Sequence, residues 1–326
     1  MECSIHAGST YIVCAHRYDI ISICIIRKVF EMRLTTEKVI FDFCRDNAPI
    51  AALDVPASIE VSTKDCFSNQ LREPGDAMEA LDWDETNPAT GPIYINGAEP
   101  GDTLKVSIDK IEVDAKGTVC VIEGEGALSH KISGTRSKIV PVKDGFAEFS
   151  ADIRIPIKPM IGVIGVAPAE GSVNSGTPGR HGGNMDNMMV CEGAVLYFPV
   201  AVEGGLLALG DVHAVMGDGE VGVTGLEIPA EVTLTIEVIK GKAPEYPILE
   251  NEDVFSMIVS KETIDEAAEV SSELMMEFLK SRIDLPSDEI VMLMSLVGNV
   301  EICQIVDPLK TVRFVFPKKY MTRTEF

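Results

Sequence analysis

The sequence has 326 residues, of which 46% are hydrophobic, and this is enough to bury a substantial core. Its formal net charge of −23 argues against a nucleic acid or an anionic membrane as the partner, because a polyanion would be repelled. The eight cysteines are scattered without CxxC pairing, which indicates reduced thiols and predicts a cytoplasmic protein.

Residues 1–31 differ in character from the rest of the chain. The apolar run at residues 20–26 is too short to span a bilayer, and no small-residue cleavage site follows it. We therefore expect residues 1–31 to be a dispensable extension rather than a signal peptide. The length of the remainder predicts two domains, a β domain at residues 32–150 and a second β domain at residues 151–326 that carries the site.

Residues 38–113 alternate apolar and polar side chains, and Pro-Gly pairs at 74–75 and 100–101 break the pattern into strands. Further strands are predicted around residues 119–122, 138–142, 146–153 and 228–241. Residues 82–97, which carry the only tryptophan, are predicted to form a long functional loop. The fold class expected is mainly β, with antiparallel sheets arranged as a sandwich or a barrel.

The central residues 181–227 bring two of the five histidines and several acids together among glycines and apolar runs. Two apolar runs, 195–202 and 206–215, predict a strand, a tight turn at Gly204 and Gly205, and a second strand. Pro199 indicates an edge strand or a bulge in the first of them.

Acidic residues recur at two-residue spacing in this stretch. Residues two apart on a strand share a face, so Asp211 and His213 should point the same way, and so should Asp218 and Glu220 if the chain stays extended. A buried carboxylate is costly unless it is paired or binds a metal. Neutral imidazole together with carboxylates is a ligand set that suits zinc and similar divalent ions.

Helical periodicity occurs only near the end of the chain. Residues 261–282 repeat apolar side chains at close to a 3.6-residue period, and a second helix is predicted to begin after Pro286 and to end near Val297. A strand at residues 313–316 follows. We therefore expect a small α/β C-terminal part with helices within 261–297, and its hydrophobic helices favour a homo-oligomer, a dimer.

Several features have simpler readings. Gly217, Gly219 and Gly222 spell the dinucleotide fingerprint GxGxxG, but the residues after them read as a strand, and a phosphate site needs a helix there. Without further context, His181 reads as a loop histidine and Glu227 as a solvent-facing acid.

Five motifs in order resemble those of the acetamidase/formamidase family: TKDCFSNQL at 63–71, NPATGPIYINGAEPGD at 87–102, HGGNMDN at 181–187, YFPVAVEGG at 197–205 and GDVHAVMGDGE at 210–220. The resemblance extends from about residue 32 to the end of the chain. It implies a mainly β fold with a small helical part and the hydrolysis of short aliphatic amides to the acid and ammonia. Met185 within HGGNMDN is similar to the acetamidase-like members.

Matching the motifs residue by residue implies a set of site residues: Asp65, Asn87, His181, Asn184, Asp186, Asp211, His213, Asp218 and Glu220. In the mechanism we expect, a divalent ion, zinc with calcium as the alternative, is bound by Asp186, Asp211 and His213. Glu220 or Asp65 would act as the general base, and His181 would contact the substrate or support the ligands. Substrate contacts are predicted from Asn87, Thr90, Asn184 and Asp218.

Two alternatives remain open at this stage. A nucleophilic Cys66 would need no metal, although a single cysteine at a strand end is more often simply packed. A non-catalytic metal- or sugar-binding β-sandwich would use the same acids to hold calcium. His213 counts against that reading, because calcium prefers oxygen ligands.

Overall fold

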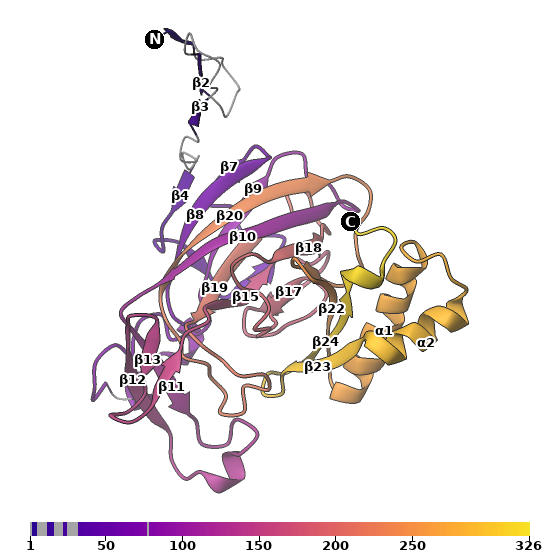
Figure 1. Ribbon diagram of the computed structural model, residues 1–326. Coiled ribbons are helices and arrows are strands. Elements are labelled where there is room, and N and C mark those ends of the chain that lie inside the picture. The colour runs from indigo at the N-terminus through magenta and orange to yellow at the C-terminus, as the bar shows by residue number, and fades with distance from the viewer. Residues whose placement is uncertain (1, 5–11, 16–21, 25–31, 77) are drawn as a thin grey trace.

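The computed structural model describes residues 2–4, 12–15, 22–24, 32–76 and 78–326. Strands dominate these ranges, and the helical part lies at the C-terminal end (Figure 1). The predicted fold class, mainly β with antiparallel sheets and a small helical C-terminal part, is confirmed. No described helix is both long and apolar enough to cross a membrane.

The largest sheet has nine strands. Their order across the sheet is β23 (Asn299–Gln304), β24 (Lys310–Pro317), β22 (Val254–Lys261), β21 (Ile248–Glu250), β18 (Val195–Pro199), β10 (Thr103–Val113), β20 (Ala230–Ile239), β8 (Ala57–Thr63) and β4 (Met32–Leu34). Every neighbouring pair is antiparallel except β4 and β8. This sheet contains strands from both sides of residue 150, so both predicted domains contribute strands to it. The two-domain description stays a prediction.

A six-stranded sheet packs against the large one. Its strands are β17 (Gly182–Asn184), β15 (Met160–Gly165), β19 (Leu207–His213), β9 (Ala89–Ile95) and β5 (Val39–Ile40), with β7 (Ala51–Leu53) parallel to β9. The main core lies between the two sheets, where apolar side chains of β8, β10 and β20 meet those of β9, β15 and β19. All seven residues of β19 are buried, so its two polar side chains, Asp211 and His213, need partners inside the protein.

Smaller sheets complete the β part. One contains β11 (Lys116–Val121), β12 (Arg136–Lys143), β13 (Phe146–Glu148) and β14 (Arg154–Pro156), and another pairs β16 (Ser172–Asn174) with β6 (Asp42–Cys44). Within residues 1–31, β1 (Glu2–Ser4), β2 (Ile12–Ala15) and β3 (Ser22–Cys24) pair with one another. The remaining residues of the predicted extension lie outside the described ranges, so its dispensability stays a prediction.

Both predicted helices are confirmed. Helix α1 (Ile264–Lys280) begins at Thr263, whose side chain accepts a hydrogen bond from the backbone N–H of Glu266 and so caps the first turn. Its buried residues recur at helical spacing, and they pack with α2 (Ser287–Val297) on β22 and β24 to form a second apolar core. The two helices project to one side of the sheets (Figure 1).

The predicted hairpin around Gly204 and Gly205 is wrong. Strands β18 and β19 belong to different sheets, because the chain crosses from one sheet to the other between them. Both glycines and Leu206 have positive φ, and a Cβ on Gly204 would collide with the ring of Tyr94. Pro199 ends an interior strand and does not mark an edge, since β18 lies between β10 and β21.

The predicted long loop at residues 82–97 is also only partly loop. Its first half contains a short 3₁₀ helix at Trp83–Glu85, but its second half is β9, a nearly fully buried strand inside the six-stranded sheet. The turn residues of NPATGP concealed this strand. The remaining connection, residues 82–88, leads directly to the functional site.

Candidate active site

Buried acids converge on a cavity of about 450 Å³, which we call the acid cavity. Its floor is formed by Asp211 from β19, by Asp186 after β17, and by Glu220 and Glu227 from the segment after β19. Cys66, just after β8, also lines it. The other lining residues are Phe67, Trp83, Thr86, Asn87, Ile122, Glu123, Glu125, Asn184, Val223, Thr224, Val306, Asp307 and Pro308.

His213 is the centre of the acid cluster beneath this cavity. Its Nε2 atom lies 3.2 Å from Oε1 of Glu227, 3.5 Å from Oδ1 of Asp211 and 3.7 Å from Oδ1 of Asp186. All four side chains are at most 3% exposed. The structure thus confirms that Asp211 and His213 approach one another, as their spacing on a strand predicted.

Several polar atoms of this cluster have no hydrogen-bond partner. They are Oδ1 of Asp186, Oδ1 of Asp211, Oε2 of Glu227 and Nδ1 of His213. Unpaired buried polar atoms cost free energy, so they call for a ligand or an ion that satisfies them. The unpaired Oδ1 atoms are the same atoms that face His213 Nε2.

The protonation equilibria show how charge is distributed. Burial alone would lower the pKa of His213, but the carboxylates of Glu227 and Asp211 outweigh it and raise that pKa well above its usual value. Burial would raise the pKa of Asp211, yet His213 lowers it. Each of the two groups therefore favours the charged form of the other.

The remaining carboxylates repel one another. Burial raises the pKa of Glu227 to about 8. Burial, followed by the charge of a neighbouring carboxylate, also raises the pKa of Asp186, Glu220 and Asp307 well above the usual value. The cluster holds more acid than one histidine can balance, and a bound cation would relieve the repulsion.

The donor atoms fit a divalent ion such as zinc. Two groups of three ligand atoms each lie within 4.8 Å of one another: Asp186, His213 and Glu220, and Cys66, Asp211 and Glu227. Ligands that sit about 2.0–2.1 Å from a tetrahedral zinc ion are separated from one another by about 3.4 Å. The distances of 3.2 to 3.7 Å from His213 Nε2 match that separation.

The backbone at the site is strained. Asn87, Asp186, Asp211, Glu220 and Val223 all have φ between 40° and 83°, which is unusual for residues other than glycine. Such strain persists where the surrounding structure fixes it, and it concentrates at functional sites. The two aspartates are also closely packed against the neighbouring strand. A Cβ on Gly162 would lie 2.5 Å from Oδ1 of Asp186 and 2.6 Å from Oδ2 of Asp211.

Two predicted contact residues line the acid cavity. Asn184 donates from Nδ2 to Oδ2 of Asp307 at 3.1 Å, while its own Oδ1 is buried without a partner. Asn87 lines the cavity beside Trp83, and its backbone N–H donates to the carbonyl of Cys66. An amide substrate could therefore donate its N–H groups to Asn184.

The other predicted site residues lie outside the acid cavity. Oδ1 of Asp65 accepts from the backbone N–H groups of Phe67 and Asn69, which makes it a turn-capping acid, and burial raises its pKa to about 6. Thr90 is buried in β9 and donates to the carbonyl of Ser62.

Asp218 and His181 also point elsewhere. Asp218 pairs with the guanidinium of Arg313 through both oxygens, whereas Glu220 enters the acid cavity, so the extended path predicted for this pair is wrong. The positive φ of Glu220 turns the chain between them. His181 lines a separate cavity and packs edge-on against Phe43, and its burial lowers its pKa to about 4.

Glu227 and Asp307 were missed as site residues. The interpretation of Glu227 as solvent-facing is wrong, because it is 2% exposed and contacts His213. Its position in an apolar stretch, GLEIPA, was the available signal. Asp307 lies in the β23–β24 connection, far from the central motifs, and no local pattern marks it.

Cys66 lies at the cavity but not as a thiolate. Burial, followed by the charges of Glu227 and Asp211, raises the pKa of its thiol well above the usual value. A nucleophilic cysteine needs the thiolate, so this environment opposes the cysteine route.

A model described as the Acetamidase/Formamidase family matches residues 36–177 and 169–265. The chain belongs to the acetamidase/formamidase family. Its fold and the order of its five motifs agree with this assignment.

Relatives within the family include a formamidase of Methylophilus methylotrophus, 37% identical over 83 residues, and an acetamidase of Mycolicibacterium smegmatis, 35% identical over 75 residues. These matches span only 20% and 18% of the two relatives.

Solved structures match over far more of the chain. A predicted acetamidase/formamidase from Thermoanaerobacter tengcongensis shares 48% identity with a TM-score of 0.87, over 90% of this chain and 98% of the other. An acetamidase from Bacillus halodurans shares 41% identity with a TM-score of 0.86, over 88% and 98%.

Proposed function

We propose that this acetamidase/formamidase family member hydrolyses short aliphatic amides to the carboxylic acid and ammonia in the acid cavity. The observation that carries this proposal is the pair of unpaired carboxylate oxygens, on Asp186 and Asp211, that face Nε2 of His213 beside an open cavity. Family membership and the names of the relatives support the reaction class.

Asp186, Asp211 and His213 would hold a divalent ion, for which we propose zinc. Bound there, the ion would supply a Lewis acid that polarises the amide carbonyl and makes water a stronger acid. Oε1 of Glu227 lies 3.2 Å from the same Nε2 atom, so this carboxylate is close enough to contact the same ion.

Glu220 is the acid–base residue in this proposal. It is 6% exposed, lines the acid cavity and lies next to Asp186 and His213. From that position its carboxylate takes a proton from the attacking water and returns it to the departing nitrogen. Asn184 accepts an N–H of the substrate amide at its free Oδ1 and so orients the scissile bond. Asp65, Thr90, His181 and Asp218 receive no direct role.

The test combines ammonia release from formamide and acetamide with metal analysis of protein purified without chelator. We expect activity and about one equivalent or more of bound metal, and loss of both after exhaustive chelation. Full activity in the chelated protein would refute the metal, and no ammonia from a broad panel of amides would refute the amidase.

One variant separates a ligand from a base. Glu220 is close enough to Asp186 and His213 to bind the same ion. If Glu220 acts only as a base, however, Glu220→Gln should keep its metal and lose most of its rate. A variant that loses the metal as well would make Glu220 a ligand and leave Glu227 as the acid–base residue.

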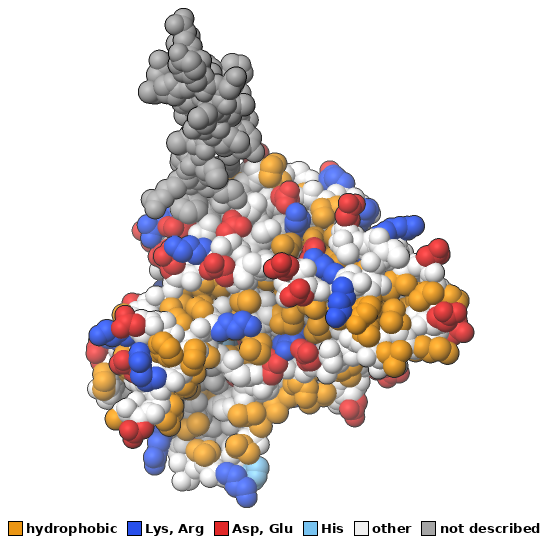
Figure 2. All heavy atoms as spheres, in the orientation of Figure 1, with side chains coloured by type: hydrophobic (Ala, Val, Ile, Leu, Met, Phe, Trp, Pro, Cys, Tyr) orange, Lys and Arg blue, Asp and Glu red, His pale blue; other side chains and the backbone are white. Residues whose placement is uncertain are grey.

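We also propose that the protein is a homodimer. Helix α2 has no charged residue after Glu289, and Val291, Met292 and Leu296 are 46%, 61% and 80% exposed. Apolar side chains gather over the surface formed by the two helices (Figure 2). A helix that is apolar on its outer face is normally covered. Light scattering of the wild type and of Leu296→Glu tests this, with a monomeric wild type as the contrary result.

We propose that the protein resides in a reducing compartment, because the cysteines whose side chains are described are not paired in disulfides. Cys44, Cys66, Cys120, Cys191 and Cys303 are free thiols in the described part of the chain, which agrees with a cytoplasmic location.

A further inference from the structure

The acid cavity is much larger than the amides named above. Acetamide has four non-hydrogen atoms and fills roughly the space of two or three water molecules, at about 30 Å³ each. The cavity has about 450 Å³, which lies in the size range of sites that enclose much larger ligands. An acetamide on the acid floor would leave most of this space to water.

The space above the floor has apolar walls. Phe67, Ile122, Val223 and Val306 line the cavity together with the buried acids, and Trp83, which also lines it, is 50% exposed and therefore lies at the opening. A large aromatic ring left half exposed on a monomer needs a reason, and covering an apolar part of a ligand provides one.

The opening carries negative charge. Glu123 and Glu125 are exposed lining residues on the segment after β11, on the same cavity as Trp83. Among the described lining residues none is lysine, arginine or histidine. An aromatic face beside two carboxylates attracts a cation and repels an anion.

We propose that the acid cavity takes primary amides larger than acetamide, whose acyl group is an apolar chain that ends in a positively charged group. The amide lies on the acid floor, the chain runs along the apolar walls, and the charged end reaches Trp83, Glu123 and Glu125. This proposal rests on the amide hydrolysis proposed above and assigns its substrate class.

Four substrates test the proposal: acetamide, hexanamide, 6-aminohexanamide, and the monoamide of adipic acid, which is an anion. Hexanamide should exceed acetamide in kcat/KM by at least tenfold, since each buried methylene contributes about fourfold. The cationic amide should exceed the anionic one by roughly tenfold at low salt, because surface charge pairs contribute modestly. That second ratio should shrink in about 1 M salt. Acetamide as the best substrate, or equal rates for the two charged amides, would overturn the proposal.

Matched variants locate the two effects. Trp83→Ala should lower the ratio of hexanamide to acetamide in kcat/KM. Replacing Glu123 and Glu125 together by glutamine should bring the ratio of cationic to anionic amide close to one. Glu85→Gln is the control, because Glu85 is an exposed acid of the same Trp83 segment that does not line the cavity. A control that changes the charge ratio as much as the double variant would contradict the assignment.

Binding can be measured without turnover. Trp83 is the single tryptophan of the chain, so its fluorescence reports directly on the opening of the cavity. Hexylammonium chloride should shift this fluorescence with saturation, and hexanoate should do so only at far higher concentration. If hexylammonium binds but no amide is cleaved, the reaction proposed above fails while the cavity preference stands. If amides are cleaved but neither probe saturates, the preference fails alone.

Discussion

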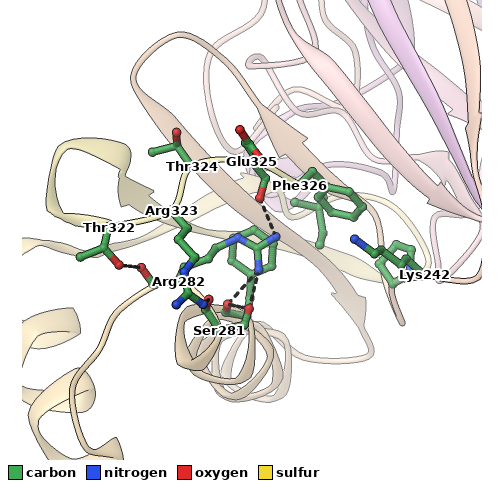
Figure 3. A pocket seen from close by; sticks show the side chains of 11 residues that line it. Lys242, Ser281, Arg282, Thr322, Arg323, Thr324, Glu325 and Phe326 are labelled. Carbon is green, nitrogen blue, oxygen red and sulfur yellow. Dashed lines mark hydrogen bonds between the residues drawn. The ribbon is translucent and has the colours of Figure 1, made fainter.

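The acid cavity and the cavity at the C-terminal end differ in the way their charged groups are satisfied. The C-terminal cavity is larger, about 780 Å³, and is lined by Lys242, Arg282, Arg323 and the last residues of the chain. One terminal nitrogen of Arg282 donates to the carbonyl oxygen of Glu325 (Figure 3). The other donates to the carbonyl oxygen of Phe278, on whose ring the guanidinium stacks, and only Nε is buried without a partner. In the acid cavity, carboxylate oxygens of three different residues are buried without partners, and the backbone is strained.

This difference shows that volume alone does not locate a functional site. Arg282 ties the end of α1 to the C-terminal segment, so its charge contributes to the fold. Around His213, carboxylate oxygens are buried without partners, and perturbed acids and strained backbone of this kind concentrate at functional sites.

The largest expected effect is that of His213→Ala. Removing the imidazole removes one of the three proposed metal ligands. Loss of a residue that merely supports a ligand costs about 10–100-fold, so the loss in kcat should exceed that. Metal content should fall in parallel. The double variant with Asp211→Asn should be scarcely slower than the single one, because residues that act as a unit are not additive. A variant that keeps both metal and turnover would remove the acid cluster from the mechanism.

Gly162→Ala probes the positioning of the two aspartates. Its Cβ would lie 2.5 Å from Oδ1 of Asp186, so that carboxylate must move. A misplacement of about 1 Å can cost about 100-fold in rate, so we expect kcat/KM to fall by about that factor. Gly217→Ala is the matched control, because its Cβ would meet no atom within 4 Å. Equal kinetics for the two variants would show that the acid positions are adaptable.

His181 should affect acid stability. Burial holds its pKa at about 4 in the folded protein, against 6.5 when unfolded. As the pH falls from 6.5 to 4, the unfolded state gains a proton that the folded state does not, and stability falls by about 3 kcal/mol. His181→Gln should lose less stability over this range in denaturant titrations. Parallel pH profiles for the two proteins would contradict this.

The smallest effect is expected at the C-terminal cavity. Arg282→Ala removes hydrogen bonds from a charged donor to two carbonyls, which should lower the free energy of unfolding by about 2 kcal/mol. We expect kcat/KM for acetamide to stay unchanged. A loss of rate comparable with that of Gly162→Ala would mean that the two cavities are coupled.

Much of the fold could be predicted from local patterns. The strict alternation of residues 230–239 and the apolar period of α1 each identify one element, because a single face is buried. The sheet to which a strand belongs could not be predicted this way. β18 and β19 have the same apolar character. The chain crosses between the two sheets through Gly204, Gly205 and Leu206, which all have positive φ, and a Cβ on Gly204 would collide with Tyr94.

The site was predictable where its residues share a strand. Asp211 and His213 met as expected, and the motif HGGNMDN contributed Asp186 and Asn184. Glu227 and Asp307 reach the cluster through tertiary packing alone, so spacing carries no signal for them. Asp65, a motif acid next to a strand end, accepts backbone hydrogen bonds of its own turn and does not line the acid cavity, so its role as a base stays a prediction.

The nine-stranded sheet also has a consequence for how the chain folds. Thr63 of β8 pairs with Ala230 of β20, which lies 167 residues later, and β10 pairs with β20 along its whole length. Pairings so distant in sequence close slowly, since the entropy of a long loop is lost before the contacts form. During synthesis, β8 and β10 therefore emerge from the ribosome long before β20, and until β20 follows they lack the strand that lies between them in the sheet. A chaperone that binds nascent chains would find its sites on these two strands.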